Sequence, residues 1–326
     1  YNLPNKLKAL CELVECEEEE VPTYNFDLTS PNWALEGVTD ESSFINWLAT
    51  RSNNDNNDLT NIIVADFNFV GDRVFCNMTA DGTIYDLSSL GLVNADKIGV
   101  VNGLTILYLQ INQIETFNPS IPLPSSLTIL YLQINQIETF NPSIPLPSSL
   151  TYLDLKDNQI VTFNPTIPLP NSLTYLGLND NQIVTFNPTI ALPSSLTILD
   201  LNSNQIVTFN PTIALPSNLT ELYLDGNQIV TFNPSIPLPS SLTHLGLNSN
   251  QIVTFNPTIA LPNSLTYLDL YGNQMTLSGY TASETWANAQ PAFTNICGVN
   301  FGGNIDSITG TTLETILISK GCIIIP

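Results

Sequence analysis

Side chains that could do chemistry are few and scattered in this chain. His244 is the only histidine. The five cysteines lie outside the repetitive stretch that begins at Leu104, and they are Cys11, Cys16, Cys76, Cys297 and Cys322. The sequence has neither the clustered His and Cys that bind zinc nor the G-x-S-x-G and G-x-x-x-x-G-K-[ST] motifs of hydrolases and phosphate-binding loops. It therefore predicts no enzyme, no metal site and no cofactor, with His244 an ordinary exposed side chain.

The cysteine pattern points to cross-links, if any, at the ends of the chain. An odd number of cysteines leaves at least one thiol unpaired or intermolecular. Cys297 and Cys322 bracket the last segment, and they could form a disulfide or remain two buried free thiols. The residues alone leave these two alternatives open.

The charge balance excludes some partners. The chain of 326 residues carries 7 Lys and Arg against 29 Asp and Glu, a formal net charge of −22 at pH 7. This charge repels phosphate backbones and anionic membranes, so nucleic acid is not expected as a partner. No run approaches the ~20 apolar residues of a membrane span. Because only 11% of the residues are charged, we expect a largely neutral surface of hydroxyl and amide groups, suited to contact more than to electrostatic steering.

The sequence repeats every 23 residues from Leu104 onward. Most copies read L-T-x-L-x-L-x-x-N-Q-I-x-T-F-N-P-[ST]-I-[PA]-L-P-x-[SN], and we number the positions of a copy from its first Leu. Residues 104–126 and 127–149 are identical, and the eighth copy loses the pattern after Gln274. Eight repeats, the last degenerate, are therefore predicted over residues 104–277. They start at Leu104, Leu127, Leu150, Leu173, Leu196, Leu219, Leu242 and Leu265.

The motif L-x-x-L-x-L-x-x-N in each copy resembles the signature of the leucine-rich-repeat family, over just over half of the chain. The resemblance implies a leucine-rich-repeat solenoid, a right-handed β-rich superhelix with a parallel sheet on its inner, concave side. The residues agree, because Leu at positions 4 and 6 points to one side of a strand and positions 3, 5 and 7 point to the other. Leu at 1, 4, 6 and 20, Ile at 11 and 18 and Phe at 14 should form one continuous core. Asn at position 9 should satisfy backbone groups of its own and neighbouring coils.

The returning part of each copy, N-P-[ST]-I-[PA]-L-P, holds two or three prolines and cannot form a regular helix. We expect it to be extended or polyproline-like, which leaves the convex side thin. Both open ends of such a stack would expose core residues. Small α+β segments are therefore expected to cap the solenoid at its N- and C-terminal ends.

The flanking residues divide into three predicted parts. Residues 1–24, which include the acidic run 17–20, are predicted to be a leader or a docking arm. Residues 25–103 are predicted to be an N-terminal capping domain with a helix at 41–50 and strands at 62–69, 73–78 and 83–87. Residues 278–326 are predicted to be a C-terminal cap. It holds two possible capping boxes, 281–284 and 311–314, and the second should open a helix over 313–320 that Gly321 ends.

A comparison of the copies with one another shows where the sequence varies. The frame, including outward Thr, Asn and Pro positions, is nearly constant, whereas positions 3, 5, 7 and 8 change freely. Neutral drift is one explanation, but drift should also have scattered the exposed outer positions. We therefore predict a binding surface on the concave face. It comprises Ile106, Tyr108, Ile129, Tyr131, Tyr152, Asp154, Lys156, Tyr175, Asp200, Glu221, Tyr223, Asp225, His244, Tyr267, Asp269 and Tyr271.

The chemistry of this predicted surface changes along the solenoid. At its first end Ile and Tyr side chains form an apolar patch, which a partner or the N-terminal cap should cover. Farther along, Tyr, Asp, Asn and Gly give a composition typical of binding surfaces, and Tyr beside Asp and Asn also suits sugars. Protein and glycan ligands therefore both remain open.

These features predict a non-catalytic recognition protein that binds a protein or cell-surface glycan. The repeats and the tail 313–322 resemble leucine-rich surface proteins of bacteria and bacteriophages, which implies adhesion or virion adsorption and an extracellular or virion-surface location. The alternative is a structural or decoration component of a virion or other large assembly. In that case the solenoid would be a spacer, and residues 1–24 would dock onto other virion or surface proteins.

Overall fold

The computed structural model of the chain describes residues 104–119, 122–293 and 297–326, together with Ser88, Ser89 and five short strands that precede residue 104. These residues fall into two compact units. The first unit spans Tyr1–Tyr131 and Pro142–Leu150, and the second spans Leu132–Asn141 and Thr151–Pro326.

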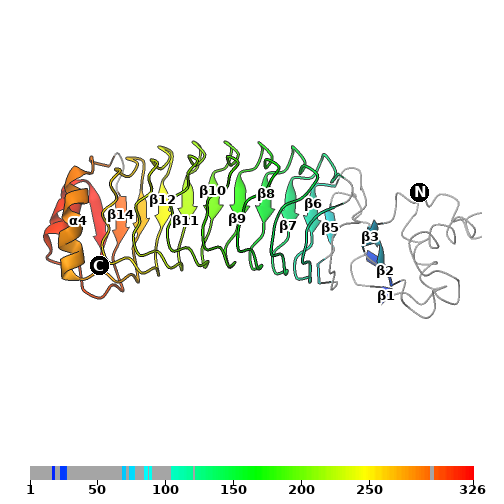
Figure 1. Ribbon diagram of the computed structural model, residues 1–326, viewed down its shortest axis with the longest axis horizontal. Coiled ribbons are helices and arrows are strands. Elements are labelled where there is room, and N and C mark those ends of the chain that lie inside the picture. The colour runs from blue at the N-terminus through cyan, green and yellow to red at the C-terminus, as the bar shows by residue number, and fades with distance from the viewer. Residues whose placement is uncertain are drawn as a thin grey trace, which may run out of the picture. The chain divides into compact units, whose positions relative to one another are not determined.

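The second unit is a parallel β-solenoid, and its strands follow chain order across one sheet (Figure 1). Each strand pairs in register with the strand of the next coil, so equivalent positions of successive coils lie side by side. This confirms the solenoid predicted from the repeat. The strands that this unit takes from the third to the eighth copy are β8 (Tyr152–Asp154), β9 (Tyr175–Gly177), β10 (Ile198–Asp200), β11 (Glu221–Tyr223), β12 (His244–Gly246) and β13 (Tyr267–Asp269).

The core of the coils is built from the predicted frame positions. Leu at positions 1, 4 and 6 and Ile at 11 are fully buried, and Phe at 14 is at most 1% exposed. From Phe140 to Phe255 the phenylalanines form a row with ring centroids 6.0–6.4 Å apart. Ile at position 18 is only half-buried, for example Ile167 and Ile190, contrary to the prediction. The reason is that the returning segments contain neither helix nor strand to cover it.

Asparagine at position 9 joins neighbouring coils through its side-chain amide. Asn181 donates from Nδ2 to the carbonyl oxygens of Leu178 (3.1 Å) and Leu155 (2.9 Å) and accepts at Oδ1 from the Ile160 N–H at 3.0 Å. The same pattern recurs at Asn158, Asn204, Asn227, Asn250 and Asn273. These amides are nearly buried, so each bond is formed away from water, as predicted.

Position 8 has a backbone requirement that the sequence pattern did not reveal. Its residue has a left-handed φ of 51–65° in every copy. Glycine adopts this conformation freely, and Asp tolerates it. Isoleucine, which occupies the position in the two identical copies, is β-branched and strained there. The residues are Ile111, Ile134, Asp157, Asp180, Ser203, Gly226, Ser249 and Gly272.

The C-terminal residues cap the solenoid and also extend it. Helix α4 (Leu277–Ala289) packs Trp286 edge-on against Phe255, with centroids 4.8 Å apart. The buried Ser283 accepts from the Phe255 N–H, and Gln290 bonds both the N–H and the carbonyl of Leu261. Helix α4 therefore satisfies backbone groups of the seventh coil. Strands β14 (Cys297–Asn300) and β15 (Cys322–Ile325) then continue the same parallel sheet.

The predicted helix starts are half correct. Thr311 caps helix α5 (Thr312–Ser319) by accepting from the Glu314 N–H at 3.2 Å, as predicted. The other predicted capping box, 281–284, is wrong, because it lies inside α4, whose N-cap is Thr276.

The sequence analysis also missed a further coil. Val299 pairs with Leu268, and Asn304 donates to the Leu270 carbonyl as a position-9 asparagine does, so V-x-F-x-x-N over 299–304 is a degenerate repeat inside the predicted cap.

The first unit contains two sheets. Strands β5 (Ile84–Asp86), β6 (Ile106–Tyr108) and β7 (Ile129–Tyr131) are parallel. Strands β1 (Glu17–Glu18), β2 (Thr23–Asp27), β3 (Asn68–Val70) and β4 (Arg73–Asn77) form an antiparallel sheet in the order β1-β2-β4-β3.

These strands test some of the predictions for residues 1–103. Strands β4 and β5 confirm the predicted strands 73–78 and 83–87, and β3 begins at the end of the predicted strand 62–69. The predicted boundary after residue 24 falls within β2, and β1 pairs with β2. The predicted helix 41–50 and most of the predicted arm 1–24 lie outside the described residues.

The two C-terminal cysteines are free thiols, so the disulfide alternative is not realised in this structure. Cys297 and Cys322 are directly opposite each other on β14 and β15, and both are buried. Neighbouring strands lie roughly 4.8 Å apart, which is within the α-carbon separation that a disulfide can span, so the two thiols are close without being bonded. The hydrogen bond to Cys322, together with burial, raises the pKa of the Cys297 thiol.

Candidate binding face

Side chains at positions 3, 5 and 7 project from one side of the sheet, which we call the sheet face. Along each strand the central residue is buried while its neighbours are mostly half-buried. All residues predicted to bind a partner lie at these positions, so each unit gathers its share of them on one face. Asp154 is 7% exposed, Lys156 and Tyr271 are exposed, and the remaining predicted residues are half-buried.

In the first unit the predicted residues form an apolar surface. Tyr108 and Tyr131 stack with ring centroids 5.0 Å apart and ring planes within 1° of each other. Ile106 and Ile129 are paired beside them across β6 and β7. These four side chains offer ring and aliphatic surface and carry no charge.

Two stacked tyrosines begin the sheet face of the second unit. The rings of Tyr152 and Tyr175 are 4.2 Å apart and nearly parallel. A β-carbon at Gly177 would lie 2.9 Å from Oδ1 of Asp154 and 3.1 Å from the Tyr175 hydroxyl. Glycine is needed here because the carboxylate and the phenol converge over it. Burial, followed by nearby Tyr and Asp groups, raises the pKa of Tyr175 well above its usual range, so the phenol keeps its proton.

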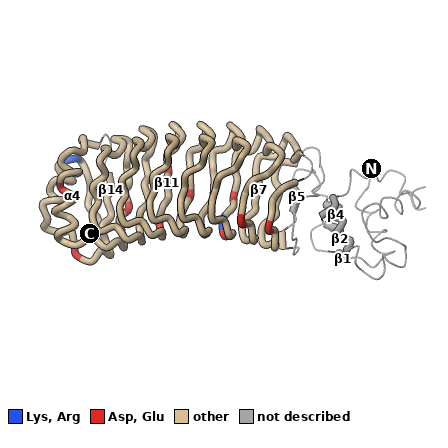
Figure 2. The backbone as a smooth tube through the Cα atoms, in the orientation of Figure 1, with Lys and Arg blue, Asp and Glu red and all other residues tan. Residues whose placement is uncertain are grey.

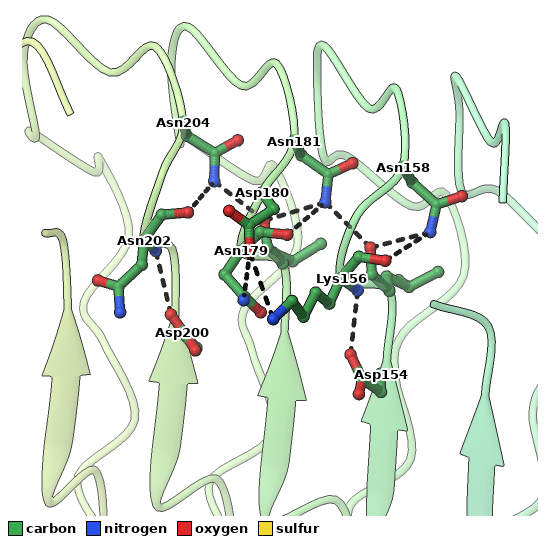
Figure 3. Close-up of polar contacts among 11 residues, drawn as sticks. Asp154, Lys156, Asn158, Asn179, Asp180, Asn181, Asp200, Asn202 and Asn204 are labelled. Carbon is green, nitrogen blue, oxygen red and sulfur yellow. Dashed lines mark hydrogen bonds and ion pairs between the residues drawn. The ribbon is translucent and has the colours of Figure 1, made fainter. Parts of the chain in front are cut away.

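Aspartate at position 5 accepts a hydrogen bond from the backbone of its own coil. Oδ1 of Asp154 accepts from the Lys156 N–H at 3.0 Å, and Asp200 and Asp269 accept in the same way from the N–H two residues later. Figure 3 shows Asp154 and Asp200 above the ends of their strands, on either side of β9. Part of the variation at position 5 therefore serves the backbone.

Two coils without aspartate at position 5 use a side chain of the preceding coil instead. The N–H of Asp225, whose coil has Tyr223 at position 5, donates to Asn202 Oδ1 at 2.7 Å. The N–H of Asn248, whose coil has Gly246, donates to Asp225 Oδ1 at 2.8 Å. In these two coils the position-7 N–H therefore depends on position 7 of the neighbouring coil.

Carboxylates dominate the electrostatics of this face. Burial raises the pKa of Asp154 and of Asp200, against the lowering effect of their backbone hydrogen bonds. Burial also raises the pKa of Asp225 to about 6, and the charges of Asp269 and Asp200 add to the shift. Lys156 lies 3.5 Å from Asp180, and both side chains are well exposed, so this ion pair adds little stability. Figure 2 shows how sparse positive charge is along the coils.

The last coils bring further predicted residues together. The Tyr223 hydroxyl donates to Glu221 at 2.7 Å, which contributes to the raised pKa of that phenol after the larger effect of burial. His244 contacts Thr243 Oγ1 through Nδ1 at 2.9 Å and lies beside Tyr267 with ring centroids 6.2 Å apart. Tyr271 covers Gly302 and Gly303 and remains 49% exposed. These contacts give His244 a hydroxyl and a ring as neighbours.

Outer polar positions are constrained more than the sequence suggested. Asn141 at position 15 accepts at Oδ1 from both the N–H and the hydroxyl of Thr166 in the next coil, at 2.9 and 2.8 Å. Thr at position 2 donates to a carbonyl of the preceding coil, as Thr197 does to Thr174. Ser at position 23 donates to the carbonyl of the first Leu of its own copy, as Ser195 does to Leu173. Constancy at these positions therefore reflects coil stacking and is weaker evidence against neutral drift on the sheet face. Gln at position 10 and Thr at position 13 are exposed and constant, and they still support the argument against drift.

Neither a metal-binding cluster nor a membrane-spanning helix is found among the described residues. In the part of the chain described here, no group of three or more His, Cys, Asp or Glu residues is arranged to hold a metal ion. Among the same residues, no helix is long and apolar enough to cross a membrane.

The family described as Leucine rich repeat matches residues 125–183, 171–229 and 217–275. No curated protein matches the chain. Among solved structures, YopM, a leucine-rich effector protein of Yersinia pestis, is 22% identical with a TM-score of 0.46. That match covers 68% of this chain and 66% of YopM, so the chain spans just under two thirds of its length.

Two other solved structures are similar at the level of the fold. The octameric complex of Latrophilin 3, Unc5D and FLRT2 (LRR) contains a chain that is 20% identical with a TM-score of 0.42, covering 68% of this chain and 75% of that one. The Toll–Spatzle complex of Drosophila contains a chain that is 20% identical with a TM-score of 0.38. Here the match covers 62% of this chain and 35% of the other.

Proposed function

This chain is a leucine-rich-repeat protein, and we propose that it is a non-catalytic recognition protein whose sheet face binds a protein partner. Leucine-rich repeats commonly mediate protein–protein recognition and typically act as binding scaffolds without catalysis. The observation that carries the proposal is the set of half-exposed Tyr rings and carboxylates on the sheet face. Many outer polar groups are engaged in bonds between coils, whereas these rings and charges present surface to solvent.

The aromatic content of the face supports a macromolecular partner. Stacked tyrosines supply large, rigid contact area at a low cost in conformational entropy, and tyrosine is enriched among residues that dominate interface energies. Tyr152 and Tyr175 offer such a pair, and Tyr223 stands two coils farther along. A glycan is the second partner class, because the same rings lie beside hydrogen-bonding carboxylates.

We propose a surface setting on the strength of the sequence resemblance alone. In that setting the chain would act in adhesion or in virion adsorption, and it would be extracellular or exposed on a virion. The competing role is a structural or decoration component, in which the sheet face would be dispensable.

Binding of the purified chain to an array of surface proteins and glycans tests the proposal. The decisive variant combines Tyr152→Ser, Tyr175→Ser and Tyr223→Ser. Its matched control combines Val161→Thr, Val184→Thr and Val207→Thr, which alters exposed side chains at position 12, away from the sheet face. We expect the tyrosine variant to lose at least about 100-fold in affinity and the control to bind normally. Unchanged binding by the tyrosine variant would favour the structural role.

A further inference from the structure

Two thiols meet at the C-terminal end of the parallel sheet. Cys297 begins β14 and Cys322 begins β15, and the two residues are directly opposite each other in this strand pair. Because opposite residues of neighbouring strands point to the same side, both side chains enter the core, where Cys297 is fully buried and Cys322 is 5% exposed. Strand register therefore holds the two thiols together on the side opposite the sheet face.

The two cysteines occupy the position whose side chains link the other coils. Tyr267 pairs with Gly298, so Cys297 follows Thr266, which is position 2 of the eighth copy, across the sheet. Position 2 is threonine in all eight copies, and its hydroxyl donates to the preceding coil, as Thr266 does to the Thr243 carbonyl at 3.0 Å. A thiol is only a weak donor, so cysteine weakens this link between coils unless the two sulfurs themselves form one.

A metal ion does not explain the pair. A structural zinc ion takes four ligands, commonly Cys and His. In the part of the chain that the structure describes, no third His, Cys, Asp or Glu joins Cys297 and Cys322 to complete such a site. Oxidation of the two thiols to a disulfide needs no further ligand.

The environments of the two thiols give them different reactivity. The hydrogen bond that Cys297 donates holds the pKa of the Cys322 thiol below its usual range, while the same bond and burial raise the pKa of Cys297. The thiolate is the reactive form, so Cys322 is the thiol that attacks an oxidant. Among the described strands β15 pairs with β14 alone, and a terminal strand held on one side opens most readily, which exposes Cys322.

We propose that Cys297 and Cys322 are a redox-active pair whose reversible disulfide locks β15 onto β14. Their strands lie roughly 4.8 Å apart, within the α-carbon separation that a disulfide spans. This inference goes beyond the proposed function and does not depend on it. Closing the ring from Cys297 to Cys322 would restrict the opened chain and so keep the last strand of the solenoid paired.

A peroxide is the class of oxidant that the pair requires. The Cys322 thiolate attacks one oxygen of hydrogen peroxide, the O–O bond breaks, and a sulfenic acid forms as hydroxide leaves and takes up a proton to become water. The Cys297 thiol then attacks the Cys322 sulfur, the S–S bond forms, and the sulfenic oxygen leaves as a second water. The two thiols thereby lose two electrons and two protons, and one peroxide is reduced to two water molecules.

Peptide mapping of the full chain tests the cross-link. The chain is reduced with dithiothreitol, treated with a small excess of hydrogen peroxide, and digested with trypsin without reduction. Lys320 is the only Lys or Arg between the two cysteines, so a disulfide would join fragments 157–320 and 321–326, each of which holds one cysteine. We expect mass spectrometry to find the joined fragments after peroxide and separate fragments after dithiothreitol. Unjoined fragments after peroxide, or fragment 321–326 joined to Cys11, Cys16 or Cys76, would overturn the assignment.

Hydrogen exchange tests whether the disulfide locks the strand. We expect the amides of residues 322–325 to exchange at least about tenfold more slowly in the oxidised wild type than in the reduced one. Cys297→Ala and Cys322→Ala are matched controls, because each removes one thiol and keeps a small apolar side chain, and peroxide should leave their exchange unchanged. Equal slowing in either variant, or none in the cross-linked wild type, would contradict the lock. The mapping of the wild type does not depend on these variants.

Discussion

The buried frame and the sheet face of the same coils follow different rules. The frame repeats the same residues because each of its groups meets its own copy in the next coil, as the Asn181 amide and the phenylalanine row show. The face varies, yet its variation is not all free. Position 8 varies among residue types while every copy keeps a left-handed backbone. At position 5 the aspartates accept from the backbone two residues later, and the coils of Tyr223 and Gly246 take an acceptor from the preceding coil. A variable position in a repeat is therefore an exposed position. It indicates binding only if its variation is not explained by backbone hydrogen bonds or backbone conformation.

The largest difference between frame and face is expected when two asparagines that are two residues apart are each replaced by alanine. Asn181→Ala removes the donor to two Leu carbonyls and the acceptor for the Ile160 N–H, all buried. We expect a loss of about 3–5 kcal/mol in unfolding free energy, or loss of a single cooperative transition. Urea denaturation followed by circular dichroism measures it.

Asn179→Ala is the matched control on the sheet face. Its side chain makes one hydrogen bond, to the half-exposed Asp180, so the expected loss is under about 1 kcal/mol. If the two substitutions cost the same, the distinction between frame and face is wrong.

Substitutions at position 8, where the backbone is left-handed, should change stability by a smaller amount, and they can lower it or raise it. Gly226→Ile places a β-branched residue at φ 65°, and we expect a loss of about 1–2 kcal/mol. Ile134→Asn relieves the same strain at φ 55°, because asparagine tolerates this region, and should raise stability by about 1 kcal/mol. Thermal unfolding of both variants checks the pair, and stabilisation by Gly226→Ile would contradict the backbone requirement.

The acidic face predicts a modest pH dependence. The pKa of Asp225 is about 6 in the folded chain, above the value of about 3.9 for an unfolded aspartate. Ionisation of Asp225 therefore disfavours the folded state. The stability that the protonated carboxyl contributes is lost as the pH rises from about 4 to about 6. Asp225→Asn keeps an acceptor for the Asn248 N–H and should be more stable than wild type at pH 7 by about 1–3 kcal/mol, with the gain shrinking below about pH 6. A gain that is unchanged at pH 4 would show that charge is not the cause.

The sequence alone predicts the frame well, because stacking requires identical residues at a fixed period. The Leu, Ile and Phe core and the position-9 amides follow directly from that period. The degenerate coil at Val299 was missed because Val and Phe replace two leucines and helix α4 interrupts the spacing. The start of α4 at Thr276 was missed because the residues at 281–284 imitate a cap.

The candidate site could be predicted only in part. Alternation along a strand correctly placed the predicted residues on one face, since the strand period is two. The backbone role of the position-5 aspartates was not predicted, because it depends on the hydrogen bond to the N–H two residues later, which the sequence pattern does not show. Whether Cys297 and Cys322 lie opposite each other also depends on the pairing of β14 with β15, which the sequence does not specify.

The central claim is that the sheet face binds a partner independently of the frame that holds it. The most direct measurement is the affinity of the array-identified partner for wild type and for the variant with Tyr152, Tyr175 and Tyr223 replaced by Ser, at matched thermal stability. The account predicts that binding falls at least about 100-fold while the unfolding temperature changes little. Equal affinity of the two proteins would contradict it.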